Sequence, residues 1–140
     1  MIGIDYGQAR IGLSISDGMK IIARPIGHVK ACRQMQRNAL NVIKAVEAEE
    51  NIGNIDTIVV GFPRKLSGKI SLMGDEVNLF IEKLQEVVSM PIIRWDERMT
   101  TLQATRAMKE ANMNRKKRSK IIDTMSAVII LQSYLDYVCQ

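Results

Sequence analysis

The chain begins MIGIDYGQARIGLSIS, and these residues, 1–16, predict two strands at 1–6 and 10–16 because apolar and small residues alternate through the second strand. Asp17-Gly18 is a two-residue hairpin signal. The next segment, residues 20–29, carries Pro25 and is therefore predicted to be an edge strand. Together the first 29 residues predict a three-stranded antiparallel meander.

Beyond the meander the hydrophobic period changes from two to that of a helix. Two continuous apolar runs predict strands buried on both faces, and apolar residues three and four apart predict helices. The predicted strands cover residues 57–60 and 91–95, and the predicted helices cover residues 33–50, residues 73–87, a segment capped by Thr100 and Gln103, and Ser119 to the last residue. This order predicts one α/β domain over residues 1–140, with a mixed five-stranded sheet flanked by helices. Two parallel strands extend the meander.

Composition narrows the classes of partner. Twenty Lys and Arg against fifteen Asp and Glu give a net charge of +5, which favours a polyanionic partner, although basic domains without one exist. Cys32 and Cys139 stand far apart, so neither a zinc site nor a disulfide framework is predicted. A Ser-His or Cys-His mechanism would need His28, the single histidine. No apolar run reaches the roughly 18 residues of a membrane span, so we expect a cytoplasmic protein without a membrane partner.

Three acidic positions lie where a folded domain has little structural need for a carboxylate. Asp5 follows Ile2-Gly3-Ile4 in a strand predicted to be central. Asp96 and Glu97 follow the predicted strand 91–95, at the edge where α/β folds build their sites. Asp123 shares a helical stripe with apolar residues four and seven positions later, so it is predicted to face the sheet. Simpler interpretations stay open: a turn cap for Asp5, and favourable first-turn charges for the others.

Converging carboxylates without a His or Cys partner suit Mg²⁺ or Mn²⁺, which prefer oxygen ligands. Two such ions about 3.5–4 Å apart can activate water and stabilise the leaving oxygen in phosphodiester hydrolysis. Cations before the last predicted helix oppose its dipole, so they suit phosphate contacts, although a charge run is often only a solvated surface. The candidate nucleic-acid-binding residues are Arg98, Arg115, Lys116, Lys117, Arg118 and Lys120. The sequence therefore favours a metal-dependent nuclease.

Four segments, in this order, make the chain similar to the bacterial YqgF/RuvX family. They are Asp5-Tyr6-Gly7 with Ile11-Gly12, VGFP at residues 60–63, WDERMTT at residues 95–101, and residues 115–135, which run from RKKR through IID to AVIILQSYL. The resemblance spans almost the whole chain. One departure lies at residues 65–68, KLSG, where family members usually show Asn-Met-Asp/Asn-Gly, and we expect this loop to touch substrate.

The resemblance implies an RNase H-like fold and an endonuclease, described as Holliday-junction resolvase-like or as maturing the 5′ end of pre-16S rRNA. It implies that Asp5, Glu97 and Asp123 form the catalytic, metal-binding triad, with Asp96 as a further metal ligand. The number of ions, and the choice between Asp96 and Glu97, stay open. So does the choice between a monomer and a homodimer. On the resemblance alone, precursor rRNA is favoured over four-way DNA.

The sequence also allows two other classes of function. A non-catalytic RNA-binding ribosome assembly factor would keep the fold and the basic residues without cleaving its substrate. An ATPase of the actin and sugar-kinase type is suggested by the Asp-x-Gly-x-x-x-x-Gly pattern of residues 5–12, which resembles the first phosphate loop of that family. Those proteins need two lobes and a second glycine-rich phosphate segment, and neither fits this chain.

Overall fold

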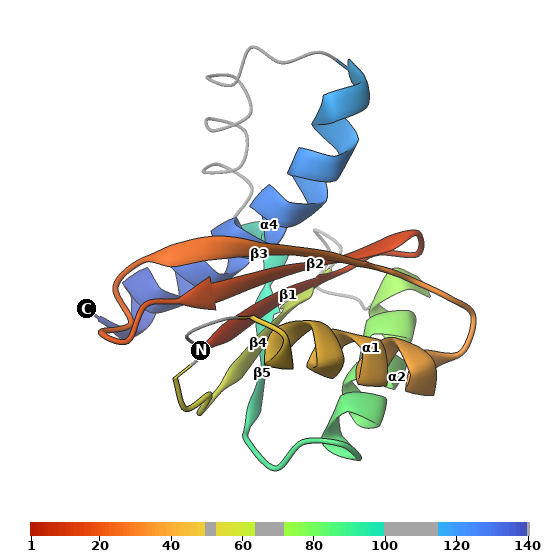
Figure 1. Ribbon diagram of the computed structural model, residues 1–140, viewed down its shortest axis with the longest axis horizontal. Helices are drawn as coiled ribbons and strands as arrows, with labels where there is room; N and C mark the ends of the chain where they lie inside the picture. Colours follow the sequence, from red (N-terminus) through yellow and green to blue (C-terminus); the bar gives the residue numbers. More distant parts are fainter. Residues whose placement is uncertain (50–52, 64–71, 100–114, 140) are drawn as a thin grey trace.

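A computed structural model describes residues 1–49, 53–63, 72–99 and 115–139, with side chains from residue 125 onward in the last range. Five strands form one sheet in the order β3-β2-β1-β4-β5 (Figure 1). Their bounds are β1 (Ile2–Tyr6), β2 (Arg10–Ser16), β3 (Ala23–Lys30), β4 (Ile58–Phe62) and β5 (Ile92–Asp96). The first three are antiparallel, and β4 joins β1 and β5 in parallel. The predicted mixed sheet is confirmed, with β1 at its centre.

Helices cover both faces of this sheet (Figure 1). Their bounds are α1 (Met35–Glu47), α2 (Leu72–Gln85), the short 3₁₀ helix η1 (Glu97–Met99) and α4 (Arg115–Val138). The first two pack on one face, and α4 crosses the other face over β1, β2, β3 and β4. The two faces are therefore covered by different parts of the chain, and the strands contribute alternate residues to each.

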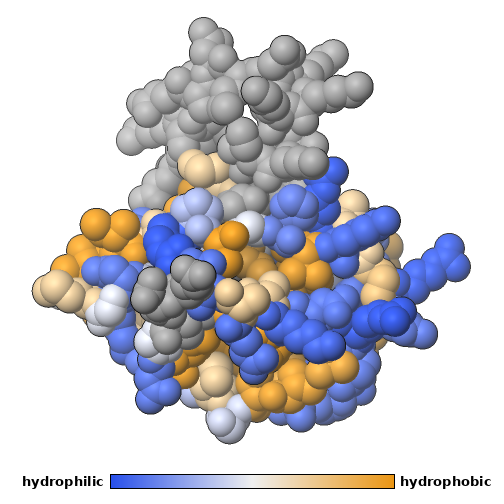
Figure 2. Space-filling model, in the orientation of Figure 1, coloured by the Kyte–Doolittle hydropathy of each residue, from blue (hydrophilic) through white to orange (hydrophobic). Residues whose placement is uncertain are grey.

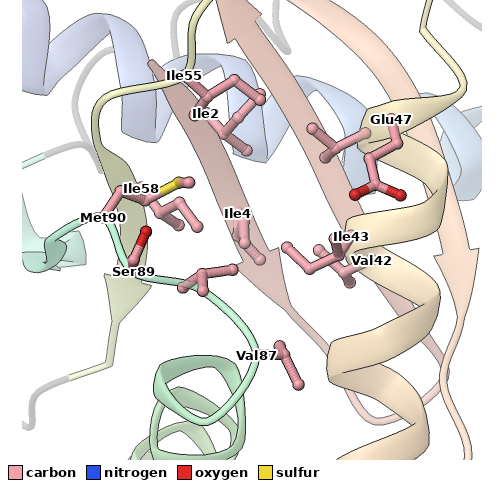
Figure 3. A pocket seen from close by; sticks show the side chains of 12 residues that line it. Ile2, Ile4, Val42, Ile43, Glu47, Ile55, Ile58, Val87, Ser89 and Met90 are labelled. Carbon is pink, nitrogen blue, oxygen red and sulfur yellow. The ribbon is translucent and has the colours of Figure 1, made fainter.

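The face under α1 and α2 is a continuous apolar core. Ile2, Ile4 and Tyr6 of β1 point into it and meet residues such as Val42 of α1 and Phe80 of α2, all buried. The Tyr6 and Phe80 rings lie 5.0 Å apart between centroids. Between β1, α1 and the segment after α2 the core leaves a mostly apolar cavity of about 210 Å³ (Figure 3).

The face under α4 holds a second, smaller apolar cluster that includes Val59, Ile130 and Leu131. Where β1 and β2 pass under the helix their residues are small, which brings the helix close to the strand backbone. A Cβ atom at Gly3 would lie 2.6 Å from Leu131 Cβ and 2.9 Å from the Ala127 carbonyl oxygen, so only glycine fits there. The buried Ser14 hydroxyl donates a hydrogen bond of 2.8 Å to that same carbonyl. Glycine and serine thus fix where α4 crosses β1 and β2.

Three sequence expectations need correction. The β2–β3 turn is longer than two residues, because the Asp17 carboxylate accepts hydrogen bonds from the Ile21 and Ile22 amides, so β3 starts at Ala23. The expected buried strand at residues 91–95 is the half-buried edge strand β5. The last helix begins at Arg115 rather than near Ser119, so the cationic run lies inside its first turns.

Other expectations fall outside the described residues, namely the helix capped by Thr100 and Gln103 and the departure at residues 65–68. Within the described part of the chain, no helix is both long and apolar enough to span a bilayer. Large hydrophobic side chains are exposed at the β2–β3 turn, where Met19, Ile21 and Ile22 are 52–77% accessible. On the face seen in Figure 2, hydrophobic and hydrophilic side chains are interspersed.

Candidate functional site

Asp5 lies near the end of the central strand β1 and is partly exposed. Its neighbours Ile4 and Tyr6 point into the core under α1 and α2, so the alternation of the strand directs Asp5 to the face that α4 covers. Across the antiparallel pair with β2, its partner is Gly12, which has no side chain to crowd the carboxylate. A central strand therefore presents a carboxylate at its carboxyl end, as the sequence predicted.

Gly61 of β4 lies beside Asp5 and determines where Glu97 sits. The parallel register pairs Ile4 with Val60, so one position further along the strands Asp5 is level with Gly61. A Cβ atom at Gly61 would lie 2.9 Å from Glu97 Oε1 and 2.4 Å from Ile130 Cδ1 of α4. The Glu97 carboxylate therefore occupies the space over Gly61, between the sheet and α4. Asp5 and Glu97 border the same glycine on the same face.

Burial raises the pKa of the Glu97 carboxyl above its ordinary value, and the negative charge of Asp96 raises this pKa further. A carboxylate that is costly to ionise in its own surroundings gains from a nearby positive charge. Asp5 and Glu97 supply hard oxygen donors, which is the chemistry that Mg²⁺ and Mn²⁺ require. The donor set at Gly61 thus fits a divalent cation of this class.

Asp96 points to a different partner. Its carboxylate accepts hydrogen bonds of 2.9 Å and 2.6 Å from Nε and Nη2 of Arg98, and another of 3.0 Å from the Arg98 amide. This two-pronged pair holds the start of η1 and leaves the Arg98 guanidinium partly exposed. Of the two adjacent acids, Glu97 is therefore the one placed over Gly61. Among the described side chains, no group of three or more His, Cys, Asp or Glu is close enough to hold a metal ion.

The other predicted site residues lie on α4. Asp123 is one turn before Ala127, and Arg115, Lys116, Lys117, Arg118 and Lys120 occupy the first two turns of the helix. Their side chains lie outside the description. Figure 1 shows that the N-terminal part of α4 runs beyond the edge of the sheet. The later part of α4, from Ala127 onward, packs on the same face as Asp5 and Glu97.

Gly61 is the site residue that sequence reasoning missed as a structural requirement. A signal was present, because a glycine inside an apolar strand marks a place where another group approaches the backbone closely. The sequence could not show that the approaching groups are Glu97 and Ile130, since that depends on the strand register and on where α4 crosses.

Comparison with known proteins adds three findings on sequence. A sequence profile of the RuvX family, described as Holliday junction resolvase, matches residues 1–137. The protein named "Putative pre-16S rRNA nuclease" from Protochlamydia amoebophila is 43% identical over 141 residues, which cover 99% of this chain and 94% of that protein. The protein of the same name from Caldanaerobacter subterraneus subsp. tengcongensis is 41% identical over 137 residues, which cover 97% of this chain and 95% of that protein.

Comparison of structures finds the same architecture in two solved chains of RuvC from Thermus thermophilus. One matches with a TM-score of 0.53 at 13% identity, covering 99% of this chain and 96% of the other. The other, a complex with a Holliday junction substrate, matches with a TM-score of 0.52 at 15% identity, and the match covers 99% of this chain and 95% of that chain. At these identities the likeness concerns the fold, and it confirms the RNase H-like architecture expected from the sequence.

Proposed function

The chain belongs to the RuvX family of nucleases, and on that basis we propose that it is a divalent-metal-dependent endonuclease that matures the 5′ end of pre-16S rRNA. The observation that carries this proposal is the meeting of Asp5 and Glu97 at Gly61, on the face of the sheet that α4 covers. The name of the relatives with 41–43% identity supports the choice of substrate.

In this proposal Asp5, Glu97 and Asp123 hold one or two Mg²⁺ or Mn²⁺ ions, and Asp96 acts through Arg98. When bound, such ions activate the attacking water and stabilise the leaving oxygen of the phosphodiester. Glu97 must be ionised to bind the cation. Because its pKa is raised, part of the binding free energy of the cation is used to ionise this carboxyl. Asp96 fixes the Arg98 side chain by its paired hydrogen bonds, and the remaining guanidinium N–H groups can orient a phosphate.

The direction of α4 supports the inclusion of Asp123. Gln132 accepts a hydrogen bond from the amide of Ala23, which pairs with Ser16 of β2. The Ala127 carbonyl accepts one from the Ser14 hydroxyl. Five residues along the helix therefore span the distance between Ser16 and Ser14 along β2. One more turn is about 6 Å, close to two strand residues. The turn of α4 before Ala127, which carries Asp123, therefore extends toward the row of Gly12 and Asp5, and this direction supports the proposal.

The basic residues of α4 support the nucleic-acid partner. Five cations stand in the first two turns, Arg115, Lys116, Lys117, Arg118 and Lys120, where the helix dipole is unfavourable to positive charge. Helix stability does not account for them, whereas phosphate groups of a nucleic acid do. We propose that this run holds the substrate backbone while the carboxylates act on one of its phosphodiesters.

The second candidate substrate is four-way DNA. It is favoured by the description of the family, Holliday junction resolvase, and by the junction bound to a protein of the same fold. A non-catalytic RNA-binding role is the third candidate, and it predicts binding without cleavage.

The test is a cleavage assay with 5′-extended pre-16S rRNA and with four-way DNA, in Mg²⁺ and in Mn²⁺. Asp5→Asn, Glu97→Gln and Asp123→Asn should each lower the cleavage rate by more than about 100-fold, since even indirect metal contacts are worth 10–100-fold. Asp75→Asn is the matched control, because Asp75 is exposed on α2. Full cleavage by the Asp5→Asn protein would overturn the proposed site. Tight binding with no cleavage by the wild-type protein would favour the assembly factor.

A further inference from the structure

A hollow of about 510 Å³ opens at the carboxyl end of β1, next to the candidate site. Tyr6 lines it, and because Tyr6 follows Asp5 in the strand, the hollow and the carboxylates lie on opposite faces of the same sheet edge. The volume falls within the range of about 300–1,000 Å³ typical of small-ligand sites. A strand of nucleic acid that passes this edge can place a phosphate at Asp5 and an adjoining base in the hollow.

The polar wall of the hollow is an amide–carboxylate pair from two distant segments. Gln8, in the turn after β1, donates a hydrogen bond of 2.9 Å from Nε2 to Glu76 Oε1 on α2. This bond orients the Glu76 carboxylate, whose other oxygen remains an acceptor site. Arg33 adds a cation on the rim, suited to a phosphate.

The apolar wall is formed by Ala31 and Met35, with the buried Tyr6 behind them. The Tyr6 hydroxyl donates to Met35 Sδ at 3.3 Å, which fixes the thioether against the ring. A backbone hydrogen bond of 3.0 Å from the Ala31 amide to the Ala9 carbonyl joins the β1–β2 turn to the segment before α1. The hollow therefore has a braced frame, a soft apolar surface suited to a flat ring and an oriented acceptor.

We propose that this hollow receives one unpaired base of the substrate strand, beside the cleaved phosphodiester, and that Glu76 selects bases with an exocyclic amino group. The inference rests on the proposed function, because it places that base next to the candidate site. A carboxylate accepts from the amino group of cytosine or adenine. Uracil has no amino group, and its single ring N–H lies between two carbonyl oxygens that a carboxylate repels.

The first test measures binding of single-stranded pentanucleotides, C5 and U5, to the wild-type protein by fluorescence anisotropy, with EDTA present so that the strands stay intact. We expect C5 to bind at least about five-fold more tightly than U5. In Glu76→Gln the new amide can still accept from Gln8 and can also donate to uracil, so the preference should fall below about two-fold. Glu82→Gln is the matched control, because Glu82 is exposed on the same helix and its loss changes the net charge equally.

The second test uses the two cysteines of the chain, both exposed thiols. Cys32 lines the hollow, whereas Cys139 lies at the end of α4, beside the Lys20 carbonyl. Saturating C5 should slow the alkylation of Cys32 by N-ethylmaleimide several-fold and leave Cys139 unchanged, as measured by mass spectrometry of the peptides. This readout does not depend on any variant folding correctly.

Equal binding of C5 and U5, an unchanged preference in Glu76→Gln, or an equal loss in Glu82→Gln would overturn the proposed base site. Protection of neither thiol, or of both equally, would also overturn it. Neither test involves cleavage, so each can fail while the Asp5→Asn assay succeeds. The opposite result, base selection without cleavage, would reject the nuclease proposal and keep the base site.

Discussion

The two faces of the sheet use the same strands for different purposes. Under α1 and α2, β1 contributes Ile2, Ile4 and Tyr6 to a continuous apolar core. Under α4, the alternate residues are Gly3 and Asp5, and the neighbouring strand β4 adds Gly61. The α4 face also has an apolar cluster, around Val59 and Leu131. At Gly3 and Gly61, however, its strands carry no side chain, so that α4 and the Glu97 carboxylate can come close to the strands.

This difference teaches that the stability and the chemistry of the fold are separable by face. Large apolar residues tolerate conservative change as long as volume is kept. Glycines under a close-packed helix tolerate less change, because an added Cβ at Gly3 or Gly61 would lie within 3 Å of other atoms, among them the Ala127 carbonyl oxygen at Gly3 and Glu97 Oε1 at Gly61. The following substitutions should therefore divide into those that lower stability and those that lower activity.

Leu84→Ala should have the largest effect on stability. Leu84 is fully buried in α2 under the apolar face, and truncation of a buried Leu lowers the free energy of unfolding by about 2–5 kcal/mol. Urea denaturation followed by circular dichroism measures this loss. The cleavage rate per folded molecule, measured well below the melting temperature, should stay within about two-fold. A parallel loss of activity per folded molecule would contradict the separation of the faces.

Gly3→Ala tests the opposite kind of change on the α4 face. The added methyl group would meet Ser14 Oγ, Leu131 Cβ and the Ala127 carbonyl at less than 3 Å, so α4 must shift away from β1. Overpacking of this kind costs about 1–3 kcal/mol of unfolding free energy. Because α4 also carries Asp123, we expect activity per folded molecule to fall as well, and the same pair of assays measures both. A variant as stable and active as wild type would show that α4 does not need this close approach.

Gly61→Ala should lower activity more than stability. The new Cβ would collide with the flexible end of Ile130, which can move, and with Glu97 Oε1, which must then leave its place over β4. We expect the free energy of unfolding to fall by about 1 kcal/mol and the cleavage rate to fall at least about ten-fold. The two losses can be compared once the rate ratio is converted to a free energy. Ala39→Gly, at a buried position of α1, is a control for a small change under the other face. An active Gly61→Ala protein would remove Glu97 from the proposed site.

The sequence predicts the strands well because alternation and β-branched runs depend on neighbouring residues only. It also predicts the carboxyl edge of the sheet, since parallel strands must end together, and so it places Asp5 and the Asp96-Glu97 pair at one edge. It could not distinguish Asp96 from Glu97, because the direction of a side chain after a strand depends on the turn that follows. The Arg98 pair and η1 provide that turn.

Two other features lay beyond sequence reasoning for the same kind of reason. The hollow beside Asp5 needs Gln8 and Glu76, which are 68 positions apart, to meet. The start of α4 at Arg115 extends a helix through a run of cations that local rules would leave outside it. Both depend on tertiary packing, which overrides local preference.

Glu97→Gln should give the smallest effect on stability, and the sign of this effect is specific. Burial and Asp96 raise the pKa of Glu97 in the folded chain. The wild-type protein therefore gains stability as the pH falls from the pKa of the folded state towards the lower pKa of the unfolded state. Above the pKa of the folded state this gain is absent. The amide cannot ionise, so at about pH 8 the metal-free variant should have a higher melting temperature than the metal-free wild type.

At about pH 4, where Glu97 is largely protonated in both states, the difference in melting temperature between variant and wild type should disappear. Added Mg²⁺ should reverse the order at about pH 8, because it binds and stabilises the wild-type carboxylate but not the amide. Differential scanning fluorimetry at both pH values, with and without Mg²⁺, measures all four differences. A variant less stable than wild type in metal-free buffer at the higher pH would mean that the Glu97 charge stabilises the fold itself. In that case the carboxylate over Gly61 would belong with the structural face of the sheet rather than with the site.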